Sequence, residues 1–212
     1  MGKRYERNTK SKIVQAAWKL FNEQGYDNTT IEDIVELSGT SRGSFYHYFD
    51  SKDSVIASMT FVLDDEYKKI IERIPDDMSA YDTLLVLNRE ICKFIENQLT
   101  VETAAQLFGS QLGVSHERII NNRDRYYYKL LRSVIEKGIA NGEITGDYTV
   151  NEVMNAYSVL ERGLVFDWCL CDGEYNLAVY SQQMLPMLMK SFFRGFSPDR
   201  DKEGTNYEIQ EI

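Results

Sequence analysis

The stretch TTIEDIVELSGTSRGSFYHYFDSKDSV, residues 29–55, decides the fold of the N-terminal part of this chain. It predicts two short helices that are joined by a tight turn. Thr29 and Glu32 have the spacing of a capping box, in which hydroxyl and carboxylate each satisfy an unpaired amide at a helix start. Gly39 can adopt the positive φ that ends a helix, so we expect the first helix to stop there.

The second helix of this pair is expected from Arg42 to Tyr48, with Thr40 and Ser41 as suitable N-caps. Phe45 and Phe49 are expected to anchor it inward. The remaining side chains end in hydrogen-bonding groups, and a short helix of this kind, held by a partner helix across a tight turn, fits the major groove of DNA.

Together with the preceding KIVQAAWKLFNEQGYD, this stretch resembles the DNA-binding domain of the TetR family of transcriptional regulators. The resemblance covers residues 9–58. It is carried by the Gly25-Tyr26 break, the Thr-Thr start, the Gly-x-Ser turn, the Phe-Tyr-x-Tyr-Phe helix and the Ser-Lys-Asp start of the next helix. It implies an all-helical, homodimeric repressor that leaves a palindromic operator on double-stranded DNA when a small-molecule effector binds.

The residues expected to contact DNA follow from their chemistry and from this resemblance. Arg42 suits either a bidentate contact to a guanine edge or a phosphate, and both alternatives stay open. Gly43 lets the helix approach the groove closely, while Tyr48 has packing as its alternative role. Thr30 and Lys52 suit phosphate contacts near helix amino termini. The predicted contacts are Thr30, Arg42, Gly43, Ser44, Tyr46, His47, Tyr48 and Lys52.

Charge is distributed unevenly along the chain, whose formal net charge is −9. Residues 1–52 are nearly neutral, and residues 53–212 carry almost all of the negative charge. The first twelve residues contain one acid, Glu6, and a group of bases that suits phosphate contact beside the helix-turn-helix. These bases are Lys3, Arg4, Arg7, Lys10 and Lys12.

Helical signals recur along the chain and strand signals do not, which predicts an all-α fold. We expect a three-helix helix-turn-helix DNA-binding domain at residues 1–52, a larger helical effector-binding and dimerisation domain at 53–197, and a disordered acidic tail at 198–212. Thr149 and Glu152 form a second capping box, and Pro186 should kink the last helix. The expected helices span residues 9–24, 31–38, 42–48, 51–73, 81–99, 101–112, 115–141, 150–171 and 176–196.

The helix expected at 51–73 would join the two domains and act as a lever between effector and DNA. The helices expected at 150–171 and 176–196 are apolar over more than one face, so they need more burial than one contact surface gives. By resemblance, they match the family's last two helices, which pair with their copies in a four-helix bundle; a monomer core is the alternative. The predicted dimer-interface residues are Tyr157, Leu160, Leu164, Leu185, Leu188 and Phe192.

The effector pocket is placed in the second domain by resemblance. Its candidate lining residues are aromatic or polar side chains on expected inward faces, for which core packing is the alternative role. The many aromatic residues suit a flat or cationic ligand through stacking and cation–π contacts. The candidates are Phe61, Phe94, Phe108, Tyr127, Glu161 and Trp168.

Several other classes of protein are disfavoured by the sequence. No uninterrupted apolar run approaches the ~18 residues of a membrane helix, and the basic N-terminus lacks the apolar segment of a secretory signal, so we expect a cytoplasmic protein. No catalytic, cofactor or metal-ligand motif is present, which argues against an enzyme. Cys92, Cys169 and Cys171 favour buried thiols, with a redox role for the last two as the alternative.

One further function stays open at this point, namely a helical adaptor that kept the fold without reading DNA. The substitution Arg42→Ala discriminates between the two functions, because only a DNA reader would lose sequence preference.

Overall fold

The computed structural model describes the backbone of residues 2–112 and 119–193, and the side chains within these ranges from residue 9 onward. In these residues the regular elements are helical, which confirms the all-α prediction; a single β-bridge joins Ile144 and Phe193. The helices are α1 (Gly2–Gln24), α2 (Ile31–Ser38), α3 (Arg42–Tyr48), α4 (Lys52–Ser58), α5 (Thr60–Ile71), α6 (Ala80–Gln98), α7 (Val101–Ser110), the 3-10 helix η1 (Ile119–Asn121), α8 (Tyr126–Ala140), α9 (Val150–Leu170) and α10 (Leu177–Met189).

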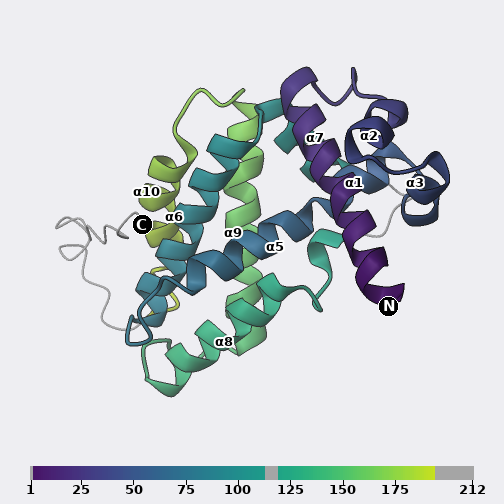
Figure 1. Ribbon diagram of the computed structural model, residues 1–212. Helices are drawn as coiled ribbons and strands as arrows, with labels where there is room; N and C mark the ends of the chain where they lie inside the picture. Colours follow the sequence, from purple (N-terminus) through teal and green to yellow (C-terminus); the bar gives the residue numbers. More distant parts are fainter. Residues whose placement is uncertain (1, 113–118, 194–212) are drawn as a thin grey trace.

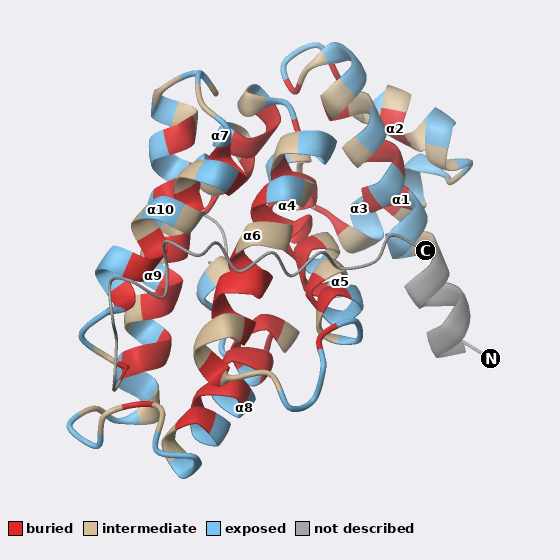
Figure 2. Cartoon of the chain, turned by 90° about the vertical axis from the view of Figure 1, so that its left-hand side faces the viewer, coloured by how far each residue is buried: buried red, intermediate tan, exposed pale blue. Residues whose placement is uncertain are grey.

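The helices form two groups, which Figure 1 shows at opposite sides of the molecule. Helices α1, α2 and α3 pack together at one end, and α6, α8, α9 and α10 form a bundle at the other. Helix α4 contacts both α1 and α7, while α5 packs against α6 and α8. Buried residues line the inner faces of both groups (Figure 2), so α4 and α5 connect two packed parts of the chain.

The capping box of α2 begins one residue later than the sequence pattern predicted. The hydroxyl of Thr30 accepts from the amide of Asp33 at 3.1 Å, and the Asp33 carboxylate accepts from the Thr30 amide at 2.8 Å. Thr29 is buried and donates its hydroxyl to the Gly25 carbonyl at 2.8 Å. The sequence allows two capping boxes, Thr29 with Glu32 and Thr30 with Asp33. Burial of Thr29 leaves Thr30 to cap the helix.

Other helix ends agree with the sequence patterns. Gly39 ends α2 with a φ of 62°, and Ser41 caps α3 by accepting from the Ser44 amide. The capping box of Thr149 and Glu152 starts α9. Since these devices depend on residues within one turn, local sequence was sufficient to place them.

The lever expected as one helix over 51–73 is instead two helices, which meet at Met59. Ser58 and Thr60 turn their hydroxyls back to the carbonyls of Val55 and Ala57, a bonding pattern that bends helices. The Thr60 carbonyl also accepts a hydrogen bond from Arg125, which comes from a distant part of the chain. A side-chain donor that inserts at a helix backbone is a recognised cause of a break.

The single helix expected at 115–141 is also wrong, and its first residues lie outside the described ones. The chain forms η1, turns through Asn122, and starts α8 only at Tyr126. Arg125 precedes α8 in an extended conformation, with φ −60° and ψ 150°. Its guanidinium is buried against α5, and this tertiary contact ends the helix that the local pattern favours.

The last helix is shorter than expected. Helix α10 contains Pro186 and ends at Met189, because Phe192 turns back and its carbonyl accepts from the amide of Thr145 at 2.9 Å. The expected end at 196 and the tail at 198–212 lie outside the described residues. Within the described part, no helix is both long and apolar enough to span a membrane.

Candidate DNA interface and effector region

Helix α3 presents a polar face outward from the three-helix unit. Phe45 and Phe49 are buried and hold the helix against its neighbours, as the sequence predicted. Arg42 and His47 are exposed, and Tyr46 is 45% exposed although it is a large aromatic residue. This exposure is the geometry that a DNA-reading helix requires.

Arg42 is positioned by α2. Its guanidinium lies 3.0 Å from the Glu32 carboxylate and 5.8 Å from the centre of the Tyr46 ring. Both partners of the ion pair are well exposed, so the pair adds little stability and can exchange for a base or phosphate. The side chain is therefore aimed along the outer face of α3 before any DNA arrives.

The other predicted contacts on α3 differ in accessibility. A Cβ at Gly43 would meet only the Ser41 hydroxyl, at 3.8 Å, so this glycine is not required for packing within the described residues. Ser44 is half-buried and shares a hydrogen bond of 2.9 Å with Ser41. Tyr48 is half-buried, with its ring edge-on to His47 at 4.7 Å.

Thr30 and Lys52, predicted to bind phosphate, already have partners within the fold. The Thr30 hydroxyl accepts the Asp33 amide and keeps its hydrogen for donation. The Lys52 ammonium donates to the carbonyls of Tyr26 and Thr29 and lies 4.1 Å above the Tyr26 ring. Lys52 therefore ties the start of α4 to the turn between α1 and α2, a structural role that sequence reasoning did not assign.

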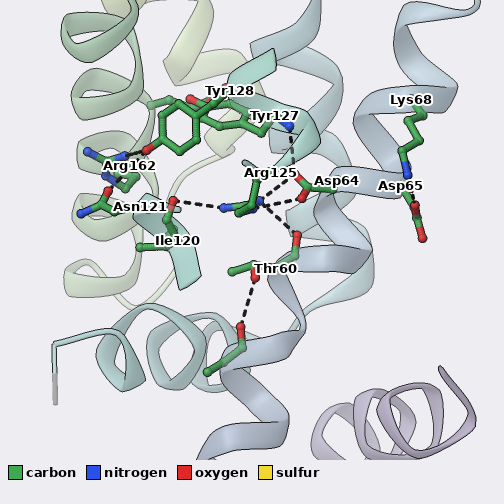
Figure 3. Close-up of polar contacts among 12 residues, drawn as sticks. Thr60, Asp64, Asp65, Lys68, Ile120, Asn121, Arg125, Tyr127, Tyr128 and Arg162 are labelled. Carbon is green, nitrogen blue, oxygen red and sulfur yellow. Dashed lines mark hydrogen bonds and ion pairs between the residues drawn. The ribbon is translucent and has the colours of Figure 1, made fainter. Parts of the chain in front are cut away.

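Sequence reasoning also missed the buried ion pair between Arg125 and Asp64 (Figure 3). Two guanidinium nitrogens donate to the two carboxylate oxygens, at 3.0 and 2.8 Å, and both side chains are almost fully buried. The same guanidinium donates to the carbonyls of Thr60 and Ile120. No local signal marks this pair, because its members are 61 residues apart.

A second link joins the DNA-binding unit to the bundle. The Asn22 side chain in α1 donates to the Gln98 carbonyl at 2.9 Å and accepts from the Thr100 amide at 3.0 Å. Thr103 in α7 donates its hydroxyl to the Phe21 carbonyl at 3.1 Å. The junction of α6 and α7 therefore holds the end of α1, so α4 is not the sole connection between the two groups of helices.

Two of the six predicted effector residues meet in a buried polar cluster. Tyr127 donates its hydroxyl to the Glu161 carboxylate at 2.6 Å, and Asn88 donates to it at 3.4 Å. The Tyr157 hydroxyl lies 3.3 Å from the same carboxylate and shares its one hydrogen between it and the Leu84 carbonyl. Burial raises the pKa of Glu161, although hydrogen bonds from Tyr127, Tyr67 and Asn88 oppose this effect. The Asn88 side-chain oxygen is buried and has no hydrogen-bond partner among the residues that the structure describes.

The other four predicted effector residues are dispersed. Phe61 is exposed on α5, with the Lys10 ammonium 5.7 Å from its ring. Phe94 packs on Trp18 of α1 at 6.0 Å, and Phe108 is half-buried against the core. Trp168 is buried and donates to the Tyr175 carbonyl at 3.0 Å. Among the described residues, these contacts involve other parts of the chain, and a common site with Tyr127 and Glu161 stays a prediction.

Three of the six residues expected at a dimer interface lie in the core of the chain itself. Tyr157, Leu164 and Leu185 are buried, and Tyr157 donates to the Leu84 carbonyl at 2.9 Å. Leu160 and Phe192 are half-buried, while Leu188 is exposed. The predicted stripe thus includes residues that the chain's own core buries, because periodicity alone does not say whether a face meets the core or a partner.

A different apolar face of α9 and α10 is open to solvent. On α9, Val159, Phe166 and Leu170 recur at helical spacing and are 58, 52 and 68% exposed. On α10, Val179 and Met187 are 58 and 68% exposed. Gly163 lies in the α9 stripe, and a Cβ there would meet nothing within 4 Å, so a second helix could approach closely at this point.

The geometry defines a helix-turn-helix protein with an attached helical bundle, and comparison with known proteins agrees. Residues 13–59 match the family described as bacterial regulatory proteins, tetR family. The chain is 30% identical to the HTH-type transcriptional regulator QacR of Staphylococcus aureus over 176 residues, which cover 78% of this chain and 76% of QacR. It is 29% identical to the uncharacterized HTH-type transcriptional regulator YvdT of Bacillus subtilis, over 85% of this chain and 93% of YvdT.

Solved structures show the same fold. The transcriptional regulator FadR of Bacillus subtilis, crystallised with stearoyl-CoA, superposes with a TM-score of 0.69 at 21% identity, over 85% of this chain and 98% of FadR. Thermus thermophilus FadR with lauroyl-CoA has a TM-score of 0.68 at 18% identity, over 89% of this chain and 97% of that one.

The chain belongs to the TetR family. It is therefore a ligand-responsive, DNA-binding transcriptional regulator that acts as a homodimer, and it is not an enzyme.

Proposed function

We propose that this protein is a cytoplasmic repressor, which binds a palindromic operator as a homodimer and leaves it when a small-molecule effector binds. The outward face of α3 carries the proposal, because Arg42, Tyr46 and His47 are exposed on a helix that two buried phenylalanines fix in place. In a dimer, two such helices would meet half-sites about one DNA turn, or a multiple of it, apart.

The residues that we propose for base and phosphate contact are those on or beside this face. Arg42 reaches a base edge or a phosphate, and Tyr46 and His47 contact the backbone or thymine methyl groups. Thr30 offers its hydroxyl hydrogen to a phosphate at the start of α2. Ser44 and Tyr48, which are half-buried, support the helix and add contacts at its edge.

The exposed stripe of α9 and α10 supports a dimer face that differs from most of the residues expected from the sequence. We assign the interface to Val159, Phe166 and Leu170 of α9 with Val179 and Met187 of α10, because contiguous exposed apolar residues mark an interaction surface. Leu188 belongs to the same surface and was predicted there.

Release from DNA is supported by the break at Met59. Helix α5 is held to α8 through Asp64 and Arg125, and α4 packs against α1, so a shift of α8 moves the junction that carries the DNA-binding unit. We propose that the effector acts on the bundle near the cluster of Tyr127 and Glu161, where a buried carboxylate accepts several hydrogen bonds. A ligand that supplies another donor or a positive charge would replace these contacts.

Selection of DNA fragments that the full-length protein binds, followed by fluorescence titration of the selected fragment, tests the function. We expect a palindromic preference, which Arg42→Ala abolishes while affinity for unrelated DNA falls much less. The control Arg73→Ala removes an exposed arginine from the turn that follows α5 and should leave the preference intact. If Arg42→Ala binds DNA of any sequence as the unmodified protein does, the adaptor function replaces the repressor.

A further inference from the structure

A groove of about 320 Å³ lies between α8 and α9 on the surface of the bundle. Its floor contains the buried side chains of Tyr128 and Met154, and its rim is polar and exposed. The rim is built by two elements that are far apart in sequence. It consists of Arg123, Lys129 and Arg132 from the α8 side and Asn151 and Asn155 from α9.

The lining of the groove carries three cations and no carboxylate. This is unusual for a chain with 33 acidic and 24 basic residues, because the charge of the groove is opposite in sign to the net charge of the chain. Among the described residues, the acidic side chain paired with the rim is Glu136, which lies 3.6 Å from Arg132 in an exposed pair. Such a pair contributes little and is readily exchanged.

Neutral groups hold the two arginines in position. Arg123 donates to the side-chain oxygen of Asn155, and its guanidinium lies 4.4 Å above the Tyr128 ring. Arg132 donates to the side-chain oxygen of Asn151 at 2.7 Å. These contacts orient both guanidinium groups without neutralising their charge. Because each asparagine uses its oxygen, its amide hydrogens are directed to other acceptors.

We propose that this groove binds the phosphate groups of a phosphorylated small molecule. Two oriented guanidinium forks and a lysine match the charge and the oxygen geometry of phosphate, which arginine binds in a bidentate manner. The apolar floor at Tyr128 and Met154 gives the remainder of the molecule a surface to pack on. The volume of the groove is many times that of one ordered water, so the groove has room for a small molecule.

The groove is also placed to affect DNA binding, and this part of the inference rests on the proposed function. Arg123 is two residues before Arg125, which donates to Thr60 and Asp64 beside the break at Met59. A ligand that takes the Arg123 guanidinium from Asn155 of α9 shifts the segment that holds α5. Occupancy of the groove therefore changes the position of α4 and the affinity for the operator.

Isothermal titration calorimetry of the full-length protein with pyrophosphate and inorganic phosphate at low ionic strength tests the site. We expect saturable binding of pyrophosphate, weakened about tenfold or more in Arg123→Gln/Arg132→Gln, because each lost guanidinium removes charge-assisted hydrogen bonds. The control Lys69→Gln/Lys93→Gln removes two exposed charges outside the groove and should bind within about twofold of the unmodified protein. Equal binding by the groove variant, or no saturable binding by the unmodified protein, overturns the site.

Two parallel measurements test whether DNA or a second copy of the protein, and not a phosphorylated ligand, occupies the groove. If the groove variant, without pyrophosphate, loses as much affinity for DNA as Arg42→Ala does, the groove contacts the duplex and the proposal is overturned. If the variant becomes monomeric in sedimentation, the groove is part of the homodimer interface and the proposal is likewise overturned. Pyrophosphate that binds without changing operator affinity keeps the site and removes the coupling. Failure to find any operator leaves the calorimetric result unaffected.

Discussion

The guanidinium of Arg125 lies 2.8 Å from the carboxylate of Asp64, and the two side chains are 5 and 6% exposed. This pair joins the residue before α8 to the middle of α5, and the same guanidinium donates to the Thr60 carbonyl at the start of α5. The contact thus connects the bundle to the point where α4 and α5 meet. The break at Met59 is therefore stabilised by contacts with a distant part of the chain as well as by the local sequence.

Removing one partner of this pair should destabilise the protein strongly. Arg125→Met leaves the Asp64 carboxylate buried, with the Tyr127 amide as its one donor among the described residues. We expect a loss of about 3–5 kcal/mol in the free energy of unfolding. The double variant Asp64→Leu/Arg125→Met should recover much of that loss, since no charge stays buried. Urea unfolding followed by circular dichroism measures both. A single variant no less stable than the exposed control Arg73→Ala contradicts the assignment.

Lys52→Met should act on stability before it acts on DNA contacts. The substitution removes the ammonium donor from the carbonyls of Tyr26 and Thr29, although the Tyr26 carbonyl still accepts from the Thr29 amide. We therefore expect the free energy of unfolding to fall by about 1–3 kcal/mol. If Lys52 mainly bound phosphate, stability would be unchanged and the salt dependence of DNA affinity would fall by about one charge. Thermal unfolding and a salt titration of DNA affinity, run on the same variant, distinguish the two roles.

Glu161 should make stability depend on pH. Burial raises its pKa in the folded state above the ordinary value of 4.5, so the folded protein holds this proton more tightly than the unfolded chain. The contribution of the protonated Glu161 side chain to stability is therefore fully present below pH 4.5. It is lost as pH rises through the folded pKa. Glu161→Gln should remove this decline. Urea unfolding between pH 4.5 and 8 tests it, and parallel curves for the two proteins would refute it.

Phe166→Glu should convert the dimer to a monomer. It places a charge in the exposed stripe of α9, where the partner helix is expected to pack, whereas Leu37→Glu changes a residue of similar exposure on α2. Tyr157→Phe should cost some stability, because it loses the bond to the Leu84 carbonyl, but should stay dimeric. Analytical ultracentrifugation reports all three masses. A monomeric Tyr157→Phe together with a dimeric Phe166→Glu would restore the interface first predicted.

The accuracy of the sequence predictions depended on how far apart the interacting residues are. Gly39, Ser41 and the pair of Thr149 and Glu152 were placed correctly, because a cap involves residues within one turn. The inward anchors Phe45 and Phe49 were likewise found by spacing. The capping box of α2 was predicted one residue too early, at Thr29 instead of Thr30, since only burial distinguishes the two threonines.

Contacts between distant residues account for what was missed. A continuous lever over 51–73 and a continuous helix over 115–141 both follow from local propensity, and Arg125 contradicts both by entering the core against Asp64. The effector candidates were chosen as inward residues, but an inward direction does not say that two residues share one cavity. Tyr127 and Glu161 are hydrogen-bonded to each other, whereas Phe61 is exposed and Trp168 donates to the Tyr175 carbonyl.

The sequence by itself determined that the chain is helical, where most helices start and stop, and that α3 carries polar tips for a DNA groove. These properties are set by side chains that are neighbours along the chain, so they can be inferred before folding is known. Only the tertiary structure decided which apolar face is left for a partner, where the lever breaks and which cations share a groove. Each of these depends on side chains tens of residues apart, whose proximity is a product of packing.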